Sequence, residues 1–209
     1  MTASVSLADL SHAGFDEEVA RAEIYGLLAQ LYYAPRAPQL LAALRAAGTE
    51  APASGAFLEA PWRDLVQEAA GMSDDAIAAE YESLFGGIGK PEVYLFGSHY
   101  LTGFLNEKPL VGLRDDLAAL GLARDPGMPE TEDHIAYLCE VMRYLIAGED
   151  AAVANLAQQR TFFTTHVQPW VHDMGQAIIA HPAARFYARV AAFTQAFASV
   201  EAQGFDMLG

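Results

Sequence analysis

The chain has 209 residues, 53% of them hydrophobic, which suits one domain, or two small domains packed closely together, around a substantial core. It carries 27 acidic and 12 basic residues, for a formal net charge of −15. This charge argues against nucleic acid or an anionic membrane as a partner, because their phosphates would be repelled, and it suits a basic partner. The single cysteine, Cys139, excludes an internal disulfide framework and a thiolate zinc site, and its apolar helical neighbours predict burial.

The ends and the apolar runs of the chain bear on where it acts. The first residues, MTASVSLADLSHAGFDEE, lack the basic segment and the apolar run of a secretory signal. No run approaches the roughly 20 apolar residues that a membrane span needs. We therefore expect a cytoplasmic protein without a targeting segment or a membrane-inserted part.

Helical periodicity dominates the chain from residue 16 onward. It predicts helices at 16–33, 37–47, 59–70, 74–85, 109–120, 131–147, 149–166, 168–180 and 183–203. The last of these carries apolar residues at alternating spacings of four and three, which indicates burial against a bundle: Phe186, Val190, Phe193, Phe197 and Val200. The segment 86–100 contains glycines and a proline, so it is expected to be non-helical, yet it is too apolar to be a solvated loop.

These patterns predict an all-α fold, a single globular bundle of about nine to ten helices. The expected organisation is a flexible N-terminus at 1–15 followed by one helical domain at 16–203. Within that domain an N-terminal half runs to about residue 125 and a C-terminal half begins at 131. A hinge near 121–132, rich in glycine and proline, joins the two halves.

The stretch PETEDH, residues 129–134, combines three acids and an imidazole in six residues. It predicts a helix that Thr131 caps, with His134 in the first turn. The positive end of the helix favours the carboxylates and disfavours imidazolium, while the neighbouring Asp133 has the opposite effect on the histidine. Such a polar cluster suits a binding site, a hinge or a helix cap.

Known catalytic and metal motifs do not fit the spacing of the polar residues. A di-iron bundle needs Glu-x-x-His on two helices, but Thr131 stands three residues before His134. His166 and His172 are separated by Pro169 and do not share a helix face. The GGIG run at 86–89 lacks the Lys-Ser/Thr of a phosphate loop. The residues thus favour a non-enzyme without metal, although an enzyme or small-ligand binder using Asp133 and His134 as an acid–base pair remains an alternative.

Four segments resemble, in order and spacing, the TorD/DmsD family of cytoplasmic, all-helical redox-enzyme maturation chaperones. They are EYESLFGGIG (80–89), YLFGSHY (94–100), PLVGLRDDLAALG (109–121) and PETEDHIAYLCEVMRYL (129–145), and the likeness extends over about residues 15–200. Tyr81, Leu84 and Phe85 match the family's aromatic-x-x-Leu-Phe mark, with Tyr81 where some members have Trp. Glu130, Asp133 and His134 match its Glu-Pro-x-Asp-His motif, with Thr131 where the family usually has Pro.

The resemblance implies binding without turnover. Family members recognise the twin-arginine signal peptide and the apoprotein of a molybdenum-cofactor oxidoreductase, of the DMSO-reductase or formate-dehydrogenase type. They assist cofactor insertion and prevent premature export. No cofactor is implied for the chaperone itself, although weak guanine-nucleotide binding has been ascribed to some members. A monomer is expected, with a possible domain-swapped dimer formed through the 121–132 hinge.

A twin-arginine peptide offers two guanidinium groups and an apolar stretch, so its receptor needs carboxylates and an aromatic-lined groove. Leu84 fits such a groove or the core equally well. The residues expected to bind the signal peptide or the client are Tyr81, Leu84, Phe85, Phe96, Ser98, Tyr100, Arg114, Glu130, Asp133 and His134.

Overall fold

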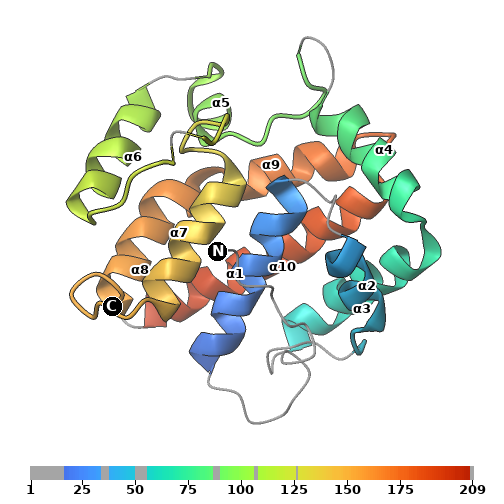
Figure 1. The fold of residues 1–209 in the computed structure, drawn as a ribbon, viewed down its shortest axis with the longest axis horizontal. Helices are drawn as coiled ribbons and strands as arrows, with labels where there is room; N and C mark the ends of the chain where they lie inside the picture. Colours follow the sequence, from blue (N-terminus) through green and yellow to red (C-terminus); the bar gives the residue numbers. More distant parts are fainter. Residues whose placement is uncertain are drawn as a thin grey trace.

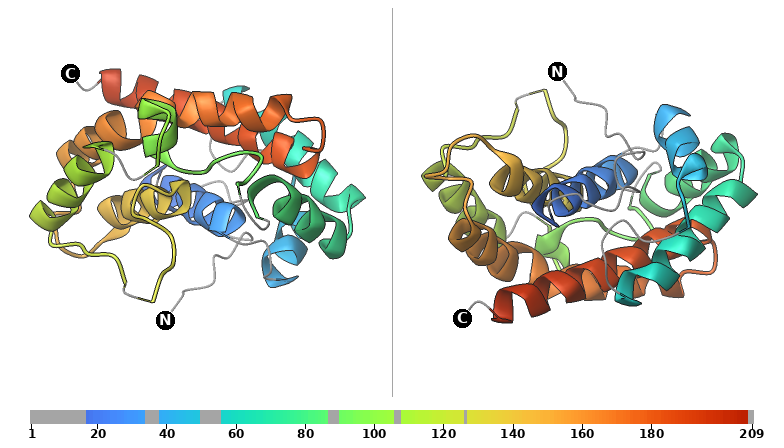
Figure 2. Two further views of the ribbon diagram at one scale, coloured as in Figure 1. Left: turned by 90° about the horizontal axis from the view of Figure 1, so that it is seen from above. Right: turned by 90° about the horizontal axis from the view of Figure 1, so that it is seen from below.

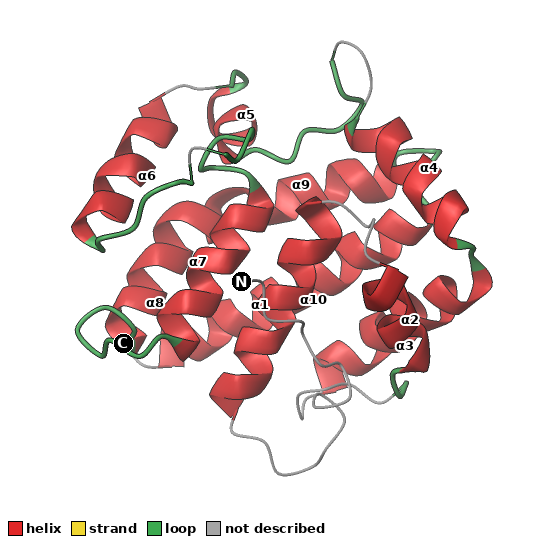
Figure 3. Cartoon of the chain, in the orientation of Figure 1, coloured by secondary structure: helices red, strands yellow, loops and turns green. Residues whose placement is uncertain are grey.

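The structure, a computed structural model, describes residues 17–33, 38–49, 56–86, 90–105, 108–125 and 127–207. The N-terminus expected to be flexible, 1–15, lies outside these residues. The regular elements of the described part are all helices, and loops connect them (Figure 1, Figure 3). Its elements are α1 (Glu17–Tyr33), α2 (Pro38–Ala46), α3 (Ala56–Gly71), α4 (Asp74–Phe85), α5 (Gly97–Thr102), α6 (Lys108–Ala119), α7 (Ile135–Ala147), α8 (Leu156–Phe162), a π-helix (Phe163–Val167), α9 (Gln168–Ala180) and α10 (Phe186–Met207). The all-α prediction is confirmed.

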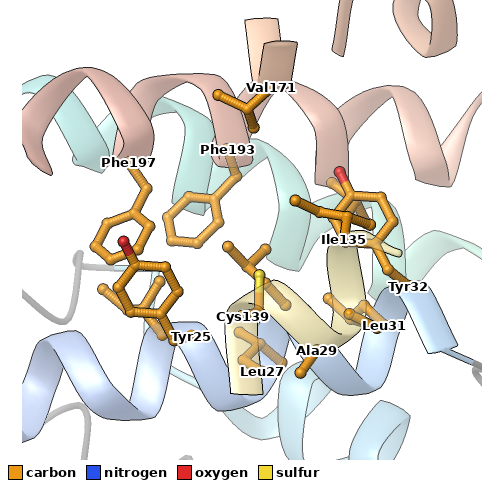
Figure 4. Packing of buried hydrophobic residues seen from close by; sticks show 14 of the residues in the cluster. Tyr25, Leu27, Ala29, Leu31, Tyr32, Ile135, Cys139, Val171, Phe193 and Phe197 are labelled. Carbon is orange, nitrogen blue, oxygen red and sulfur yellow. The ribbon is translucent and has the colours of Figure 1, made fainter. Parts of the chain in front are cut away.

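The core lies between two pairs of helices. The α1 helix packs along α7 in one layer, and α9 packs along α10 in the other, with α3 against α10 (Figure 1, Figure 2). Between the layers, Tyr25 packs edge-on against Phe197 with ring centroids 4.9 Å apart. Cys139 is buried beside Leu27 in this core, as its spacing predicts (Figure 4). The thiol is thus a small apolar group in the interior.

The start of α10 is held by a carboxylate from a distant helix. Glu80 on α4 is buried, and its Oε1 accepts hydrogen bonds from the backbone N–H groups of Arg185 and Tyr187, both at 2.8 Å. Its Oε2 accepts from the N–H of Phe186 at 3.1 Å. The first N–H groups of a helix lack partners within the helix, so Glu80 supplies a cap from α4. From there the predicted stripe of α10 enters the core, with Val200 half-buried at its end.

The helix expected to begin at Thr131 begins four residues later, at Ile135. His134 is its N-cap: the residue is extended and its Nδ1 accepts from the N–H of Ala136 at 3.2 Å. Thr131 instead lies in the preceding turn and donates its hydroxyl to Asp133. The prediction was wrong because a neutral histidine can cap a helix as well as a threonine can. The predicted and the observed helix differ only in the residue at which they begin.

Two further boundaries differ from the sequence-based expectation. The helix predicted at 149–166 begins at Leu156, where Asn155 caps it by accepting from the N–H of Gln158 at 3.1 Å. It then widens into the π-helix directly before Pro169, whose missing N–H interrupts the α-helical ladder. In the segment 86–100, expected to be non-helical, the last residues form the short α5.

The α5 and α6 helices leave the main bundle as an arm (Figure 1). The arm meets α9 at Gly97, where a Cβ atom would lie 2.9 Å from Nε1 of Trp170, so a glycine is required for this approach. Tyr100 stacks on the Trp170 ring at 5.7 Å. The α6 helix buries one stripe of leucines, Leu110, Leu113 and Leu117. None of the helices among the described residues is long and apolar enough to cross a membrane.

Candidate functional site

Asp133, the acid predicted to meet a client arginine, is buried and hydrogen-bonded within the protein. Its Oδ2 accepts from the N–H of Ser98 at 2.9 Å and its Oδ1 accepts from the hydroxyl of Thr131 at 2.6 Å. Its carbonyl accepts from the N–H of Gly97 at 3.0 Å. Asp133 therefore ties the start of α5 to the turn before α7, and Ser98 is the buried partner in this tie.

His134 is buried beside Asp133. Burial lowers the pKa of His134 to about 4, although the charge of Asp133 acts in the opposite direction. Its ring packs edge-on against Phe96 at 5.0 Å, and the two residues also form the isolated β-bridge of the described chain. The imidazole is therefore neutral at pH 7, with Nδ1 bonded to the backbone of α7.

This geometry speaks against the acid–base alternative. The carboxylate of Asp133 bonds to Ser98 and Thr131 rather than to the His134 ring, so it does not orient that ring. The Nδ1 atom of His134 is occupied by a backbone N–H, and the residue is 4% exposed. A general base must reach a substrate proton, and this imidazole is enclosed instead.

The residues of the aromatic-x-x-Leu-Phe mark lie at the end of α4. Leu84 is fully buried and belongs to the core. Tyr81 is half-buried, and its hydroxyl donates to the carbonyl of Tyr33 at 2.7 Å. Phe85 is also half-buried and packs edge-on against Tyr187 at 5.0 Å. Tyr81 and Phe85 thus reach the surface, whereas Leu84 supports them from beneath.

A row of rings connects the two predicted motifs. Tyr81 holds the end of α1 through the carbonyl of Tyr33, whose ring lies 6.1 Å from that of Tyr137. Tyr137 in turn lies 5.8 Å from the His134 ring, which contacts Phe96. Sequence positions from 33 to 137 are brought together in this way. We refer to Tyr33, Tyr81, Phe96, His134 and Tyr137 as the aromatic row.

Tyr100 stands apart from this row. Its ring stacks on Trp170 and its hydroxyl donates to the carbonyl of Tyr94 at 2.8 Å. The structure therefore does not bring Tyr100 together with Tyr81 and Phe85, and it assigns Tyr100 to the contact between α5 and α9.

A groove of about 470 Å³ begins at Tyr137, one of the residues of the aromatic row. It runs between the end of α6, the connector after α6 and the outer face of α7. Its lining is predominantly apolar, with aromatic, aliphatic and methionine side chains along α7 and the connector. Its lining residues are Leu117, Leu122, Ala123, Arg124, Asp125, Met128, Glu132, Tyr137, Glu140, Val141, Arg143, Tyr144, Ala147 and Gly148.

Glu132 gathers two arginines at the edge of this groove. Arg114 on α6 bonds to its Oε2 at 2.9 Å, and Arg124 in the connector approaches its Oε1 at 3.7 Å. Burial alone would raise the pKa of Glu132, but the hydrogen bond from Arg114 and the two positive charges hold it below its usual value. Arg114, predicted to contact the client, is thus an anchor that joins α6 to the connector.

The other charges of the rim leave carboxylates facing solvent. Glu140 pairs with Arg143 at 2.9 Å, and its side chain stays 45% exposed. Asp125 is exposed and accepts from the N–H of Gly127 at 2.7 Å. Glu130 lies half-buried in the connector, where its carbonyl faces Arg124. A basic group at the rim would therefore contact the exposed carboxylates of Asp125 or Glu140, because the arginines at the rim are already paired with acids.

Sequence reasoning missed the groove and the Glu80 cap. Both had a visible signal. Along α7, Tyr137, Val141 and Tyr144 repeat at spacings of four and three on the face opposite the core stripe, so the helix is apolar on two sides. Glu80 stands between Ile77 and Leu84 on the buried face of α4, and an acid in that position needs internal partners.

The described residues contain no group of three or more His, Cys, Asp and Glu side chains that could hold a metal ion. Their polar groups are arranged to tie helices together and to line a groove. The described residues thus form an all-helical fold with an apolar groove on its surface.

Comparison with known proteins identifies the family. A family model described as "Nitrate reductase delta subunit" matches residues 37–175, and the chain belongs to this family of TorD-type chaperones. A chaperone protein TorD of Shewanella loihica is 28% identical over 203 residues, covering 88% of this chain and 92% of the relative. One of Vibrio cholerae is 26% identical over 204 residues, covering 90% and 93%. The chain is a redox-enzyme maturation chaperone and not an enzyme.

Proposed function

We propose that this chaperone binds the twin-arginine signal peptide and the apoprotein of a molybdenum-cofactor oxidoreductase of the DMSO-reductase or formate-dehydrogenase type. It acts in the cytoplasm, assists cofactor insertion and prevents export before the cofactor is in place. The single observation that carries the binding site is the groove along α7, an apolar cleft of about 470 Å³ with exposed carboxylates on its rim. Concave apolar sites with a few polar groups are the usual form of a ligand site.

The groove matches both parts of the peptide. The apolar stretch of a signal peptide would pack on Val141, Tyr144 and Met128, and removal of this surface from water supplies most of the affinity. The two guanidinium groups would bond to Asp125 and Glu140 at the rim, where charge-assisted hydrogen bonds are the strongest polar contacts. The chain's charge of −15 would also speed the approach of a basic peptide.

The residues predicted from the sequence divide into two roles in this proposal. Tyr81, Phe85 and Phe96 are half-buried on the aromatic row or beside it, and they extend the apolar surface toward the end of α4. Asp133, His134, Ser98, Leu84 and Arg114 position the helices and the connector that form the walls. Glu130 lies in the connector next to the rim and adds negative charge there.

The test measures binding of a synthetic twin-arginine signal peptide from a DMSO-reductase-type enzyme by fluorescence anisotropy. Tyr144→Ala and Val141→Ser remove apolar contacts inside the groove, and each is expected to weaken binding by about tenfold, that is, about 1.4 kcal/mol. Ile179→Ala is the matched control, because Ile179 on α9 is 38% exposed, as Tyr144 is, and does not line the groove. The Asp125→Asn, Glu140→Gln double variant should flatten the salt dependence of binding.

The opposite pattern would relocate the site. If Tyr144→Ala and Val141→Ser bind as the unchanged protein does while Phe85→Ala binds less tightly, the peptide lies on the end of α4 instead. If the peptide does not bind the unchanged protein at low salt, signal-peptide recognition itself is refuted for this chain.

A further inference from the structure

The corner between α5 and α6 exposes large apolar side chains to solvent. Phe104 is 70% exposed, Val111 58%, and Leu101 and Leu105 are 41% each. Leu101 lies at the end of α5, Phe104 and Leu105 follow this helix, and Val111 lies in the first turn of α6. We call them the corner patch. Single exposed apolar residues are ordinary, but a concentration of this kind marks an interaction surface.

Hydrogen bonds within the chain hold the backbone at Gly103 and Phe104, directly after α5. Gly103 closes α5 in a left-handed conformation with φ of 80°, and its N–H bonds to the carbonyl of His99 at 2.7 Å. The hydroxyl of Thr102 accepts from the N–H of Phe104 at 3.3 Å and lies 3.1 Å from that residue's carbonyl oxygen. The backbone at Phe104 is therefore held by the protein itself, and its ring points outward without help from a partner. Because this backbone is already ordered, binding through the Phe104 ring would restrict only its side chain, which keeps the entropy cost low.

We propose that the corner patch binds the body of the client apoprotein, the part that follows the signal peptide. This inference rests on the proposed function, since it takes the client to be held already by its signal peptide in the groove. Val111 and Leu117 lie at opposite ends of α6, and six residues of helix separate them by about 9 Å. A precursor whose signal peptide occupies the groove would place the following residues beside the corner patch.

Charge favours this occupant over a second copy of the chain. Two chains of −15 each repel one another, so a patch-to-patch dimer would lose part of what the apolar contact gains. The exposed acids Asp115 and Asp116 stand four and five residues after Val111 on α6, with Lys108 at the start of the helix. The surface that fits here is apolar with basic residues at its edge.

Two linked contacts have a measurable consequence. Once the signal peptide is bound, the body meets the corner patch as an intramolecular partner at a high effective concentration. The full precursor should then bind more tightly than its signal peptide alone, by about tenfold or more, although neither contact is strong by itself. The corner patch supplies this difference.

The experiment compares three probes: the apo form of a DMSO-reductase-type oxidoreductase made without molybdenum cofactor, the same protein without its twin-arginine leader, and the leader peptide alone. The double variant Phe104→Ser, Val111→Ser should bind the leader peptide as the unchanged chaperone does. It should bind the full precursor about tenfold more weakly than the unchanged chaperone does. Its loss of affinity for the leaderless apoprotein should be larger than tenfold or complete. Phe57→Ser is the matched control, since Phe57 on α3 is 71% exposed and lies outside the arm.

Each outcome decides the matter. Equal loss of precursor affinity in Phe57→Ser, or undiminished precursor and leaderless binding in the double variant, would overturn the assignment of the corner patch. If the leader peptide fails to bind the unchanged protein, the groove proposal fails. The corner patch then stands or falls on whether leaderless apoprotein binds the unchanged protein and not the double variant.

Discussion

Glu80 and Asp133 are both buried carboxylates that hold the start of a distant helix, and they come from two of the four segments that carry the family resemblance. Glu80 accepts three backbone N–H groups at the start of α10. Asp133 accepts one N–H at the start of α5 and the hydroxyl of Thr131. Both carboxylates are buried, Glu80 at the start of α10 and Asp133 in a small hollow that Ser98 and Trp170 also line. The side chains of these two acids therefore hold helices in place within the protein and do not point toward a ligand.

The two ties differ in how much of the fold depends on each carboxylate. At α10, three donors depend on one carboxylate, and the helix that follows supplies a large part of the core. At α5, the carboxylate holds a helix of six residues in an arm that has a second attachment at Trp170. Loss of Glu80 should thus affect the whole fold, and loss of Asp133 should affect mainly the arm.

The largest effect is expected for Glu80→Ala. It leaves the three N–H groups at the start of α10 without their acceptor, and the free energy of unfolding should fall by about 3–5 kcal/mol, since each unsatisfied buried donor costs about 1–3 kcal/mol. Glu80→Gln keeps one acceptor oxygen and should lose less. Urea unfolding followed by circular dichroism measures both. A loss below about 1 kcal/mol in Glu80→Ala would show that water replaces the carboxylate.

A smaller effect is expected at Asp133. Asp133→Ala removes the acceptor of the Ser98 N–H and of the Thr131 hydroxyl and should cost about 2 kcal/mol. Asp133→Asn can keep both contacts, because its carbonyl oxygen accepts from Ser98 and its amide donates to the threonine oxygen, so its cost should be about 1 kcal/mol or less. Hydrogen exchange at the Ser98 amide reports the tie directly. If hydrogen exchange also became faster across α10 in Asp133→Ala, Asp133 would stabilise the whole fold as Glu80 does, and not only the arm.

The sequence predicted what depends on apolar periodicity. The core stripes of α1, α7 and α10 were recognisable because their spacing is set by the helix itself, and the burial of Cys139 followed from its place on such a stripe. The register of the α7 start was missed by four residues, because Thr131 and His134 both suit an N-cap and the choice depends on contacts with Leu95 and Ser98. Long-range partners of this kind leave little trace in a local pattern.

The candidate site shows the same limit. The resemblance pointed to segments that the fold brings close together, but a polar residue in a motif can face either a ligand or the protein, and Asp133, Ser98 and His134 face the protein. The groove depends on where the connector after α6 crosses α7, and no spacing rule fixes that crossing. Its floor could have been suspected from the second apolar stripe of α7, formed by Tyr137, Val141 and Tyr144.

An effect about as large as that of Asp133→Ala is expected for the titration of His134, the residue next to Asp133. The folded-state pKa of about 4 lies below the ordinary value of 6.5, so between these values the unfolded chain binds the proton and the folded chain does not. Stability is therefore full above pH 6.5 and falls as the pH is lowered. Between pH 7 and pH 5 this group should cost about 2 kcal/mol of unfolding free energy.

The measurement compares urea unfolding at pH 7 and pH 5 in the unchanged protein and in His134→Asn. Asparagine keeps an N-cap acceptor for α7 and does not titrate, so the variant should lose about 2 kcal/mol less than the unchanged protein between the two pH values. His172→Asn is the control for the substitution itself, because His172 is exposed on α9. If both variants keep the full pH dependence, His134 is protonated without cost in the folded state. The cap at Ala136 would then belong to an imidazole that turns toward solvent, and the tie would rest on Asp133 alone.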